Sequence, residues 1–108
     1  DSNMRSMALD NDDPAFSWRV LKFPQDLARM KTMSDILSPL DPDLRPFKNR
    51  GGKLLLYHGW SDPAISAYGT VGYYDKVKQV VGGQPQVDSF ARLYLVPGMH
   101  HCSGGRGP

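Results

Sequence analysis

A run of three consecutive leucines constrains the fold of this chain most strongly. The run lies within residues 53–57, and a strand of such composition is typically buried on both faces, as in a parallel sheet. A second apolar run spans residues 90–96. Between them, apolar residues in the segment 68–81 recur at spacings of three and four, which predicts an amphipathic helix ended by Gly82-Gly83. Strand, helix and strand form a βαβ unit, in which a right-handed crossover joins parallel strands. The sequence therefore predicts an α/β fold.

The residues before this unit are expected to be less regular. Residues 1–14 are polar and predict a loosely attached lead-in. In residues 16–23 aromatic and aliphatic side chains recur at every second position, which predicts a short strand or an extended segment. A helix is expected from Pro24 to about Ser34, because proline suits a first helical turn. Its apolar residues fall at three-residue steps and are expected to face the core: Leu27, Met30 and Met33. Further on, residues 43–49 predict a single short helical turn.

Size and charge exclude several classes of protein. With 108 residues the chain can form one small domain with a modest core. Its 13 basic and 11 acidic residues give a net charge of +2, so neither a nucleic-acid-binding nor a membrane-surface protein is indicated. No apolar stretch is long enough to predict a membrane span. The single cysteine, Cys102, is either a free thiol or half of a disulfide whose partner lies outside the chain.

Polar motifs follow both predicted strands directly. Residues 58–63 read His-Gly-Trp-Ser-Asp-Pro, and residues 97–102 read Pro-Gly-Met-His-His-Cys. Parallel α/β enzymes keep their chemistry at the carboxyl ends of strands, where a carboxylate can orient an imidazole. Asp62 lies 39 residues before His101, so only the βαβ crossover can bring these two side chains together. Because no Gly-x-Ser-x-Gly turn occurs, the sequence offers an acid and a base but no nucleophile.

Two long segments carry a family resemblance. Residues 41–63 and residues 96–105 resemble the C-terminal part of the tannase and feruloyl esterase family, whose members are serine esterases of the α/β-hydrolase fold. The resemblance implies that Asp62 is the catalytic aspartate and that His101 is the catalytic histidine. It also implies that the serine and a cysteine before it lie upstream of this chain, and that this cysteine forms a disulfide with Cys102.

The same resemblance implies a fold and a domain organisation. The chain would be the C-terminal portion of an α/β-hydrolase and therefore an incomplete fold. Residues 1–40 would be a lead-in and a helix that pack on the hydrolase core, and residues 41–108 would be the C-terminal part of the catalytic domain. Two strands cannot cover both faces and both edges of a sheet, so the remainder of the same enzyme is the expected partner. The isolated chain is expected to self-associate.

The activity implied by the resemblance is hydrolysis of esters of aromatic acids, such as galloyl or feruloyl esters, through a Ser-Asp-His triad. No cofactor, nucleic acid or membrane is implied, and the chain alone is predicted to be inactive because it lacks the serine. A disulfide at Cys102 implies an oxidising compartment, so the enzyme is expected to be secreted or periplasmic. The alternative is a non-catalytic structural or interaction module that packs against a partner.

Other interpretations of the site residues stay open. Asp62 precedes a proline and could be a turn residue, and His101 could be an ordinary loop histidine. His100 stands where the resembling family usually has glycine, and it is expected to be a non-catalytic neighbour. His58 and Trp60 are possible supports of the loop that carries Asp62, His58 through a hydrogen bond and Trp60 by packing beneath it.

A metal site is the rival use of the histidines and the cysteine. Adjacent histidines are difficult to place on one tetrahedral ion, and the sequence contains no Cys-x-x-Cys or His-x₃-His spacing. We therefore expect no metal at the side chains that could otherwise supply ligands: His58, His100, His101 and Cys102.

Overall fold

The structure, a computed structural model, describes residues 5–107. The chain divides into two compact units, residues 1–40 and residues 41–108, which are described separately below. That residues 1–40 pack on a hydrolase core stays a prediction. Among the described residues, no helix is both long enough and apolar enough to cross a bilayer.

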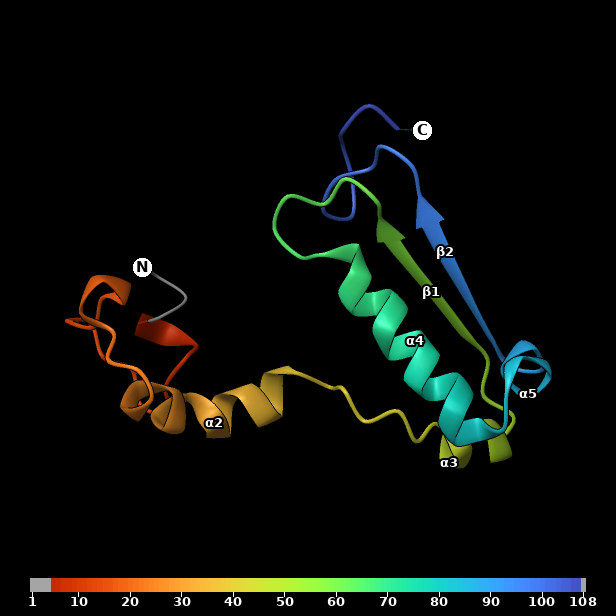
Figure 1. Cartoon of the computed structure of the whole chain (residues 1–108), viewed down its shortest axis with the longest axis horizontal. Helices are drawn as coiled ribbons and strands as arrows, with labels where there is room; N and C mark the ends of the chain where they lie inside the picture. Colours follow the sequence, from red (N-terminus) through yellow and green to blue (C-terminus); the bar gives the residue numbers. More distant parts are fainter. Residues whose placement is uncertain (1–4, 108) are drawn as a thin grey trace. The chain divides into compact units, whose positions relative to one another are not determined.

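The second unit contains the predicted βαβ arrangement. Its two strands pair in parallel, with Leu54 opposite Ala91 and Gly59 opposite Val96. The connecting helix lies along the strands, as Figure 1 shows. The sequence prediction of a parallel α/β unit is therefore confirmed, as is the helical turn expected within residues 43–49. The elements are α3 (Arg45–Asn49), β1 (Leu54–Gly59), α4 (Ala67–Val81), α5 (Gln84–Asp88) and β2 (Ala91–Val96).

The core of this unit lies between α4 and one face of the sheet. Val77 of α4 and Val87 of α5 are completely or almost completely buried, together with Phe90 at the entry to β2. Leu54 and Leu56 of β1 pack against this cluster. Burial of a Val or Phe side chain of this kind is worth about 1.5–3 kcal/mol, so these contacts fix α4 and α5 against the strands.

The opposite face of the sheet is exposed. Leu55 is 64% exposed, and the neighbouring Tyr57 and Tyr94 are also exposed. Alternate residues of β1 point to opposite faces, so the strand is half-buried, with the even-numbered leucines covered and Leu55 open. The chain by itself therefore covers only one face of the leucine run, and the other face stays exposed, as expected for a sheet of two strands.

Two local features of this unit differ from the sequence prediction. The first strand was expected to end at residue 57, but the ladder continues because His58 pairs with Leu95 and Gly59 pairs with Val96. The helix α5 was not predicted. Gly82, with a φ of 100°, ends α4 as expected, and α5 begins almost immediately because Pro85 suits its first turn.

The first unit includes the helical elements η1 (Trp18–Val20) and α2 (Gln25–Leu37). The sequence predicts a short strand or an extended segment over residues 16–23, but no strand forms there and a 3₁₀ turn interrupts the segment at Trp18–Val20. The Val20 N–H donates to the Ser17 carbonyl at 3.0 Å, and the Ser17 hydroxyl accepts the Arg19 N–H at 3.4 Å. Such local hydrogen bonds compete with a strand that has no neighbour to pair with.

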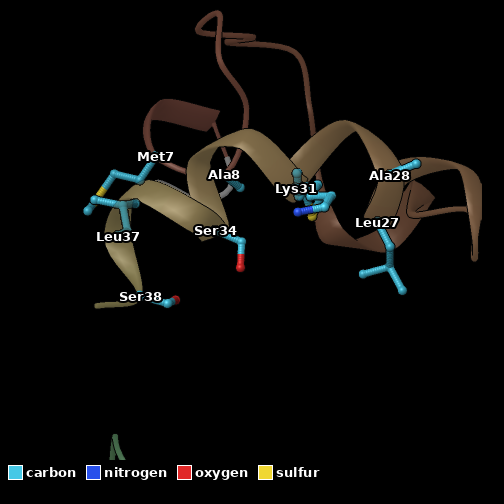
Figure 2. A pocket seen from close by; sticks show the side chains of 9 residues that line it. Met7, Ala8, Leu27, Ala28, Lys31, Ser34, Leu37 and Ser38 are labelled. Atoms are coloured by element: carbon cyan, nitrogen blue, oxygen red, sulfur yellow. The ribbon is translucent and has the colours of Figure 1, made fainter. Parts of the chain in front are cut away.

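The apolar face of α2 is open within its own unit. Leu27 and Leu37 are about half-exposed, and together with Met7 they line a shallow hollow that also includes Lys31 and Ser34 (Figure 2). Met30 and Met33 are only partly buried. The expectation that this face of the helix forms core is therefore wrong for residues 5–40 taken alone.

Candidate active site

The loops after β1 and β2 meet at the carboxyl end of the sheet (Figure 1). We call residues 60–66 the acid loop and residues 97–102 the histidine loop. The Trp60 N–H donates to the Val96 carbonyl at 2.9 Å, and the Ser61 N–H donates to the Met99 carbonyl at 3.1 Å. These backbone hydrogen bonds join the two loops directly. The residues that follow the two strands therefore stay side by side, as the strands themselves do.

The structure brings Asp62 and His101 together. His101 Nδ1 lies 2.8 Å from Asp62 Oδ2, so the predicted approach of these two side chains is confirmed. The Asp62 side chain is 3% exposed, whereas that of His101 is 55% exposed. Among the described residues, His101 Nε2 has no hydrogen-bond partner. The imidazole is thus held through one nitrogen and presents the other.

The second oxygen of Asp62 is bound by the backbone of its own loop. Oδ1 accepts the Ala64 N–H at 2.8 Å and the Ile65 N–H at 3.0 Å. The hydrogen bond from Ile65, with those from Ala64 and His101, outweighs burial and holds the pKa of the Asp62 carboxyl well below its usual range. Asp62 is therefore a turn residue, as one interpretation of the sequence predicts, because its Oδ1 binds the backbone of the acid loop. The carboxylate is ionised, and its Oδ2 is available to the imidazole.

The neighbouring histidine lies differently. His100 is exposed, and its backbone N–H donates to the Gly104 carbonyl at 3.1 Å. Among the described residues, the hydrogen-bonded imidazole partner of Asp62 Oδ2 at 2.8 Å is that of His101.

The two possible supports of the acid loop have different surroundings. His58 Nε2 lies 3.0 Å from the Ile65 carbonyl oxygen and 3.3 Å from Asp62 Oδ2. The Trp60 indole is instead exposed, and its ring packs on that of Tyr68 at a centroid distance of 5.3 Å. The expectation that Trp60 packs beneath the acid loop is therefore wrong, because its side chain lies on the surface beside the start of α4.

The glycine-rich tail after the histidine loop folds back onto it. Met99 and Gly105 form an antiparallel bridge, and the Arg106 N–H donates to the Gly98 carbonyl at 3.0 Å. Gly104 and Gly105 adopt φ angles of 72° and 88°, a region that glycine enters without strain. The tail therefore packs against the histidine loop.

Cys102 lies at the edge of the site as an exposed, free thiol. Its φ of 62° is left-handed, which is uncommon for a residue that is not glycine. A hollow of about 170 Å³ opens beside the acid and the base. It is lined by Tyr57, His58, Gly59, Asp62, Met99, His101 and Cys102.

No metal centre is formed by the part of the chain that the structure describes. Within residues 5–107 no three side chains of the His, Cys, Asp or Glu type are grouped so that they could hold a metal ion. The arrangement instead places a buried carboxylate and an exposed imidazole in hydrogen-bonding contact.

Gly59 controls how closely the two loops approach. A Cβ at this position would lie well inside 3.0 Å of the carbonyl oxygens of Met99 and His100, so Gly59→Ala must push the histidine loop away from Asp62. We expect the variant to lose the contact between Asp62 and His101, seen as a changed tautomer of the His101 ring in ¹⁵N NMR spectra. In a catalytic assay of the complete enzyme, a displacement of about 1 Å is expected to cost about 100-fold.

The matched control is Gly72→Ala. This helical glycine has open space around the position of its missing Cβ, and alanine is favoured over glycine in a helix interior by about 1 kcal/mol. The control should therefore leave the His101 spectrum unchanged and raise thermal stability slightly. An unchanged His101 spectrum in Gly59→Ala would contradict the role given to the close backbone contact.

The chain is similar to known proteins over most of its length. The family model described as "Tannase and feruloyl esterase" matches residues 2–108. The chain is 41% identical over 99 residues to a mono(2-hydroxyethyl) terephthalate hydrolase from Piscinibacter sakaiensis, an alignment that covers 82% of the chain and 16% of the relative.

Two solved esterase structures are also similar to the chain. An esterase from Aspergillus oryzae superposes with a TM-score of 0.80 at 32% identity over 97% of the chain and 21% of that structure. Feruloyl esterase B from Aspergillus oryzae superposes with a TM-score of 0.76 at 32% identity over 98% of the chain and 21% of that structure. The chain thus spans about a fifth of these structures and corresponds to an incomplete portion of an α/β-hydrolase. It belongs to the tannase and feruloyl esterase family.

Proposed function

We propose that this chain supplies the acid and the base of a serine esterase that hydrolyses esters of aromatic acids. The observation that carries the proposal is the 2.8 Å contact between the buried, ionised Asp62 and the exposed His101. In this assignment Asp62 accepts the Nδ1 proton of His101, which leaves Nε2 as the proton acceptor. The serine belongs to the rest of the enzyme, outside this chain.

The proposed reaction proceeds by acyl transfer. The serine oxygen attacks the ester carbonyl while its proton passes to His101 Nε2. The same proton then passes to the alcohol oxygen as the ester bond breaks, which leaves the acid bound to the serine. A water molecule repeats the sequence, so that the acid is released and the serine regains its proton. Throughout both halves, the negative charge of Asp62 stabilises the imidazolium that forms on His101.

The substrate class follows from the names of the relatives. Feruloyl and terephthalate esters share a carboxyl group conjugated with an aromatic system. We therefore propose galloyl-, feruloyl- or related aromatic acyl groups as the part of the substrate that is transferred. No cofactor takes part in the proposed reaction.

The thiol of Cys102 supports a proposal about compartment. It is exposed and follows the base directly, so a disulfide from this residue to a cysteine beside the serine would fasten the nucleophile near His101. Such a bond requires an oxidising environment, and we propose that the enzyme is secreted or periplasmic. The expected partner of this chain is the rest of the same enzyme.

The test uses the complete enzyme. A serine-directed phosphonate should label one serine outside this chain and abolish hydrolysis of a feruloyl or galloyl ester, and peptide mapping without reduction should show Cys102 in a disulfide. Labelling that requires no His101, or the absence of any labelled serine, would favour the alternative of a non-catalytic module. A freely reactive Cys102 in the oxidised enzyme would contradict the disulfide alone.

A further inference from the structure

We propose that His58 is a positioning residue of this site, which holds the Asp62 carboxylate turned toward His101. The inference rests on the proposed function, because it assigns a role within the same acid–base pair. It concerns a third imidazole that the acyl-transfer scheme does not use. His58 is largely buried, with a side chain that is 12% exposed.

The contacts of His58 define its tautomer. Nε2 lies 3.0 Å from the Ile65 carbonyl oxygen and 3.3 Å from Asp62 Oδ2. Both of these atoms can only accept a hydrogen bond from nitrogen, because the carboxyl is ionised, so Nε2 carries the hydrogen. Nδ1 lies 2.7 Å from Thr70 Oγ1, and in the neutral ring it accepts the hydrogen of that hydroxyl.

Two regular elements hold the His58 side chain, one through its backbone and one through Nδ1 of its ring. His58 belongs to β1 and pairs with Leu95 of β2, while Thr70 lies in the first turn of α4. The acid loop runs between these two elements and contains no helix or strand of its own. The imidazole therefore connects an irregular segment to two regular elements, which is how a supporting residue fixes a functional side chain.

His58 acts on both oxygens of Asp62. It approaches Oδ2 directly, and it holds Ile65 through the carbonyl of that residue. The Ile65 N–H in turn donates to Oδ1 at 3.0 Å. With the Ala64 N–H on Oδ1 and His101 on Oδ2, four groups surround the carboxylate. The carboxylate then cannot rotate about its bond to Cβ without breaking several hydrogen bonds at once.

We expect loss of the His58 imidazole to slow the chemical step and to have little effect on substrate binding. His101 is exposed, so its orientation depends mainly on a fixed acceptor at Asp62 Oδ2. If the acceptor turns away, the ring loses the alignment that directs Nε2 at the serine. The His58 side chain is only 12% exposed and offers little surface to a substrate, so KM should change little.

The test compares three substitutions in the complete enzyme. His58→Phe keeps a ring of similar size but removes both nitrogens. His58→Gln can place an N–H near the position of Nε2, whereas His58→Asn can reach only the position of Nδ1. Activity is measured as kcat per active site, with active sites counted by a serine-directed phosphonate, so that loss of folded enzyme does not count as loss of turnover.

We expect His58→Phe to lower kcat about 10–100-fold with KM changed less than about 3-fold, as for a displacement of about 1 Å in the site. His58→Gln should restore most of the loss, and His58→Asn should not. If His58→Phe does not fold, the comparison of the Gln and Asn variants decides the question. Equal activity of those two variants, or an unchanged kcat per active site in His58→Phe, would overturn the inference.

Asp62→Asn separates this inference from the proposed function. A large loss in Asp62→Asn together with unchanged turnover in the His58 variants would reject the positioning role and leave the esterase proposal intact. Wild-type turnover in Asp62→Asn would reject the esterase proposal itself.

Discussion

Asp62→Asn is expected to lower kcat of the complete enzyme about 10⁴-fold. The structure gives a specific reason. The Ala64 and Ile65 N–H groups both point at Oδ1, so the asparagine must place its oxygen there and its NH₂ group at the position of Oδ2. That NH₂ group would face His101 Nδ1, which would have to give up its hydrogen and accept. Nε2 would then carry the hydrogen and could not take the proton of the serine.

The matched control is Asp43→Asn. Asp43 is also an ionised, hydrogen-bonded carboxylate, since Arg45 lowers its pKa to about 2, but it lies before α3, away from the acid and histidine loops. This variant should keep wild-type kcat. Turnover within about 10-fold of wild type in Asp62→Asn would contradict the triad assignment, because positioned acid–base groups contribute at least about 10²-fold.

The same substitution has a pH-dependent effect on stability. Folding lowers the pKa of Asp62 from its ordinary value of 3.8, so the ionised carboxylate stabilises the folded chain above that pH and the contribution is lost as the pH falls below it. Tm measured at neutral pH should therefore be lower for Asp62→Asn than for wild type. The difference in Tm between wild type and Asp62→Asn should become smaller below about pH 4.

The isolated chain is expected to hydrolyse no aromatic ester and to self-associate. In the proposed mechanism the chain supplies a base and an orienting carboxylate, but none of its serines lies in a Gly-x-Ser-x-Gly turn. The loss of one triad member removes most of the catalysis. The exposed face of the sheet, with Leu55, Tyr57 and Tyr94, is the surface expected to make the contacts. Measurement of the mass in solution by light scattering, with an ester assay on the same sample, checks both expectations.

Paired variants locate the self-associating surface. Leu55→Lys with Tyr94→Lys places charge on the exposed sheet face and should give a monomer. Val80→Lys adds one positive charge on α4, away from that face, and should leave the chain self-associated. A wild-type chain that is monomeric at all concentrations would contradict the argument from the open face, whereas turnover that Asp62→Asn abolishes would show that the chain contains a nucleophile.

The sequence was sufficient to predict the elements whose pattern repeats over several turns or residues. The spacing of apolar residues in α4 and the runs in β1 and β2 each encode one conformation, and the βαβ crossover then fixed the parallel pairing. Because the two loops follow adjacent parallel strands, the contact between Asp62 and His101 could also be predicted. The position of the candidate site could thus be predicted from the topology and from two short motifs.

The remaining features depend on contacts that no local pattern reports. The 3₁₀ turn at Trp18–Val20 forms through hydrogen bonds of Ser17, and α5 is too short for a period to be visible. The sequence indicates only a possible hydrogen bond for His58, because the partners of its ring come from the acid loop and from α4. The exposure of Leu27 could not be read from the spacing of α2, since periodicity shows which residues share a face and not what covers it.

The close backbone packing of the histidine loop has a consequence for directed evolution of enzymes of this kind. Four glycines allow main-chain atoms to approach more closely than any side chain permits: Gly59, Gly98, Gly105 and Gly107. Random libraries that include these positions would mostly sample misaligned variants, whatever chemistry the new side chains brought. The exposed pair Trp60 and Tyr68 makes no such contact, so a focused library there can vary shape beside the acid loop while the alignment of acid and base is kept.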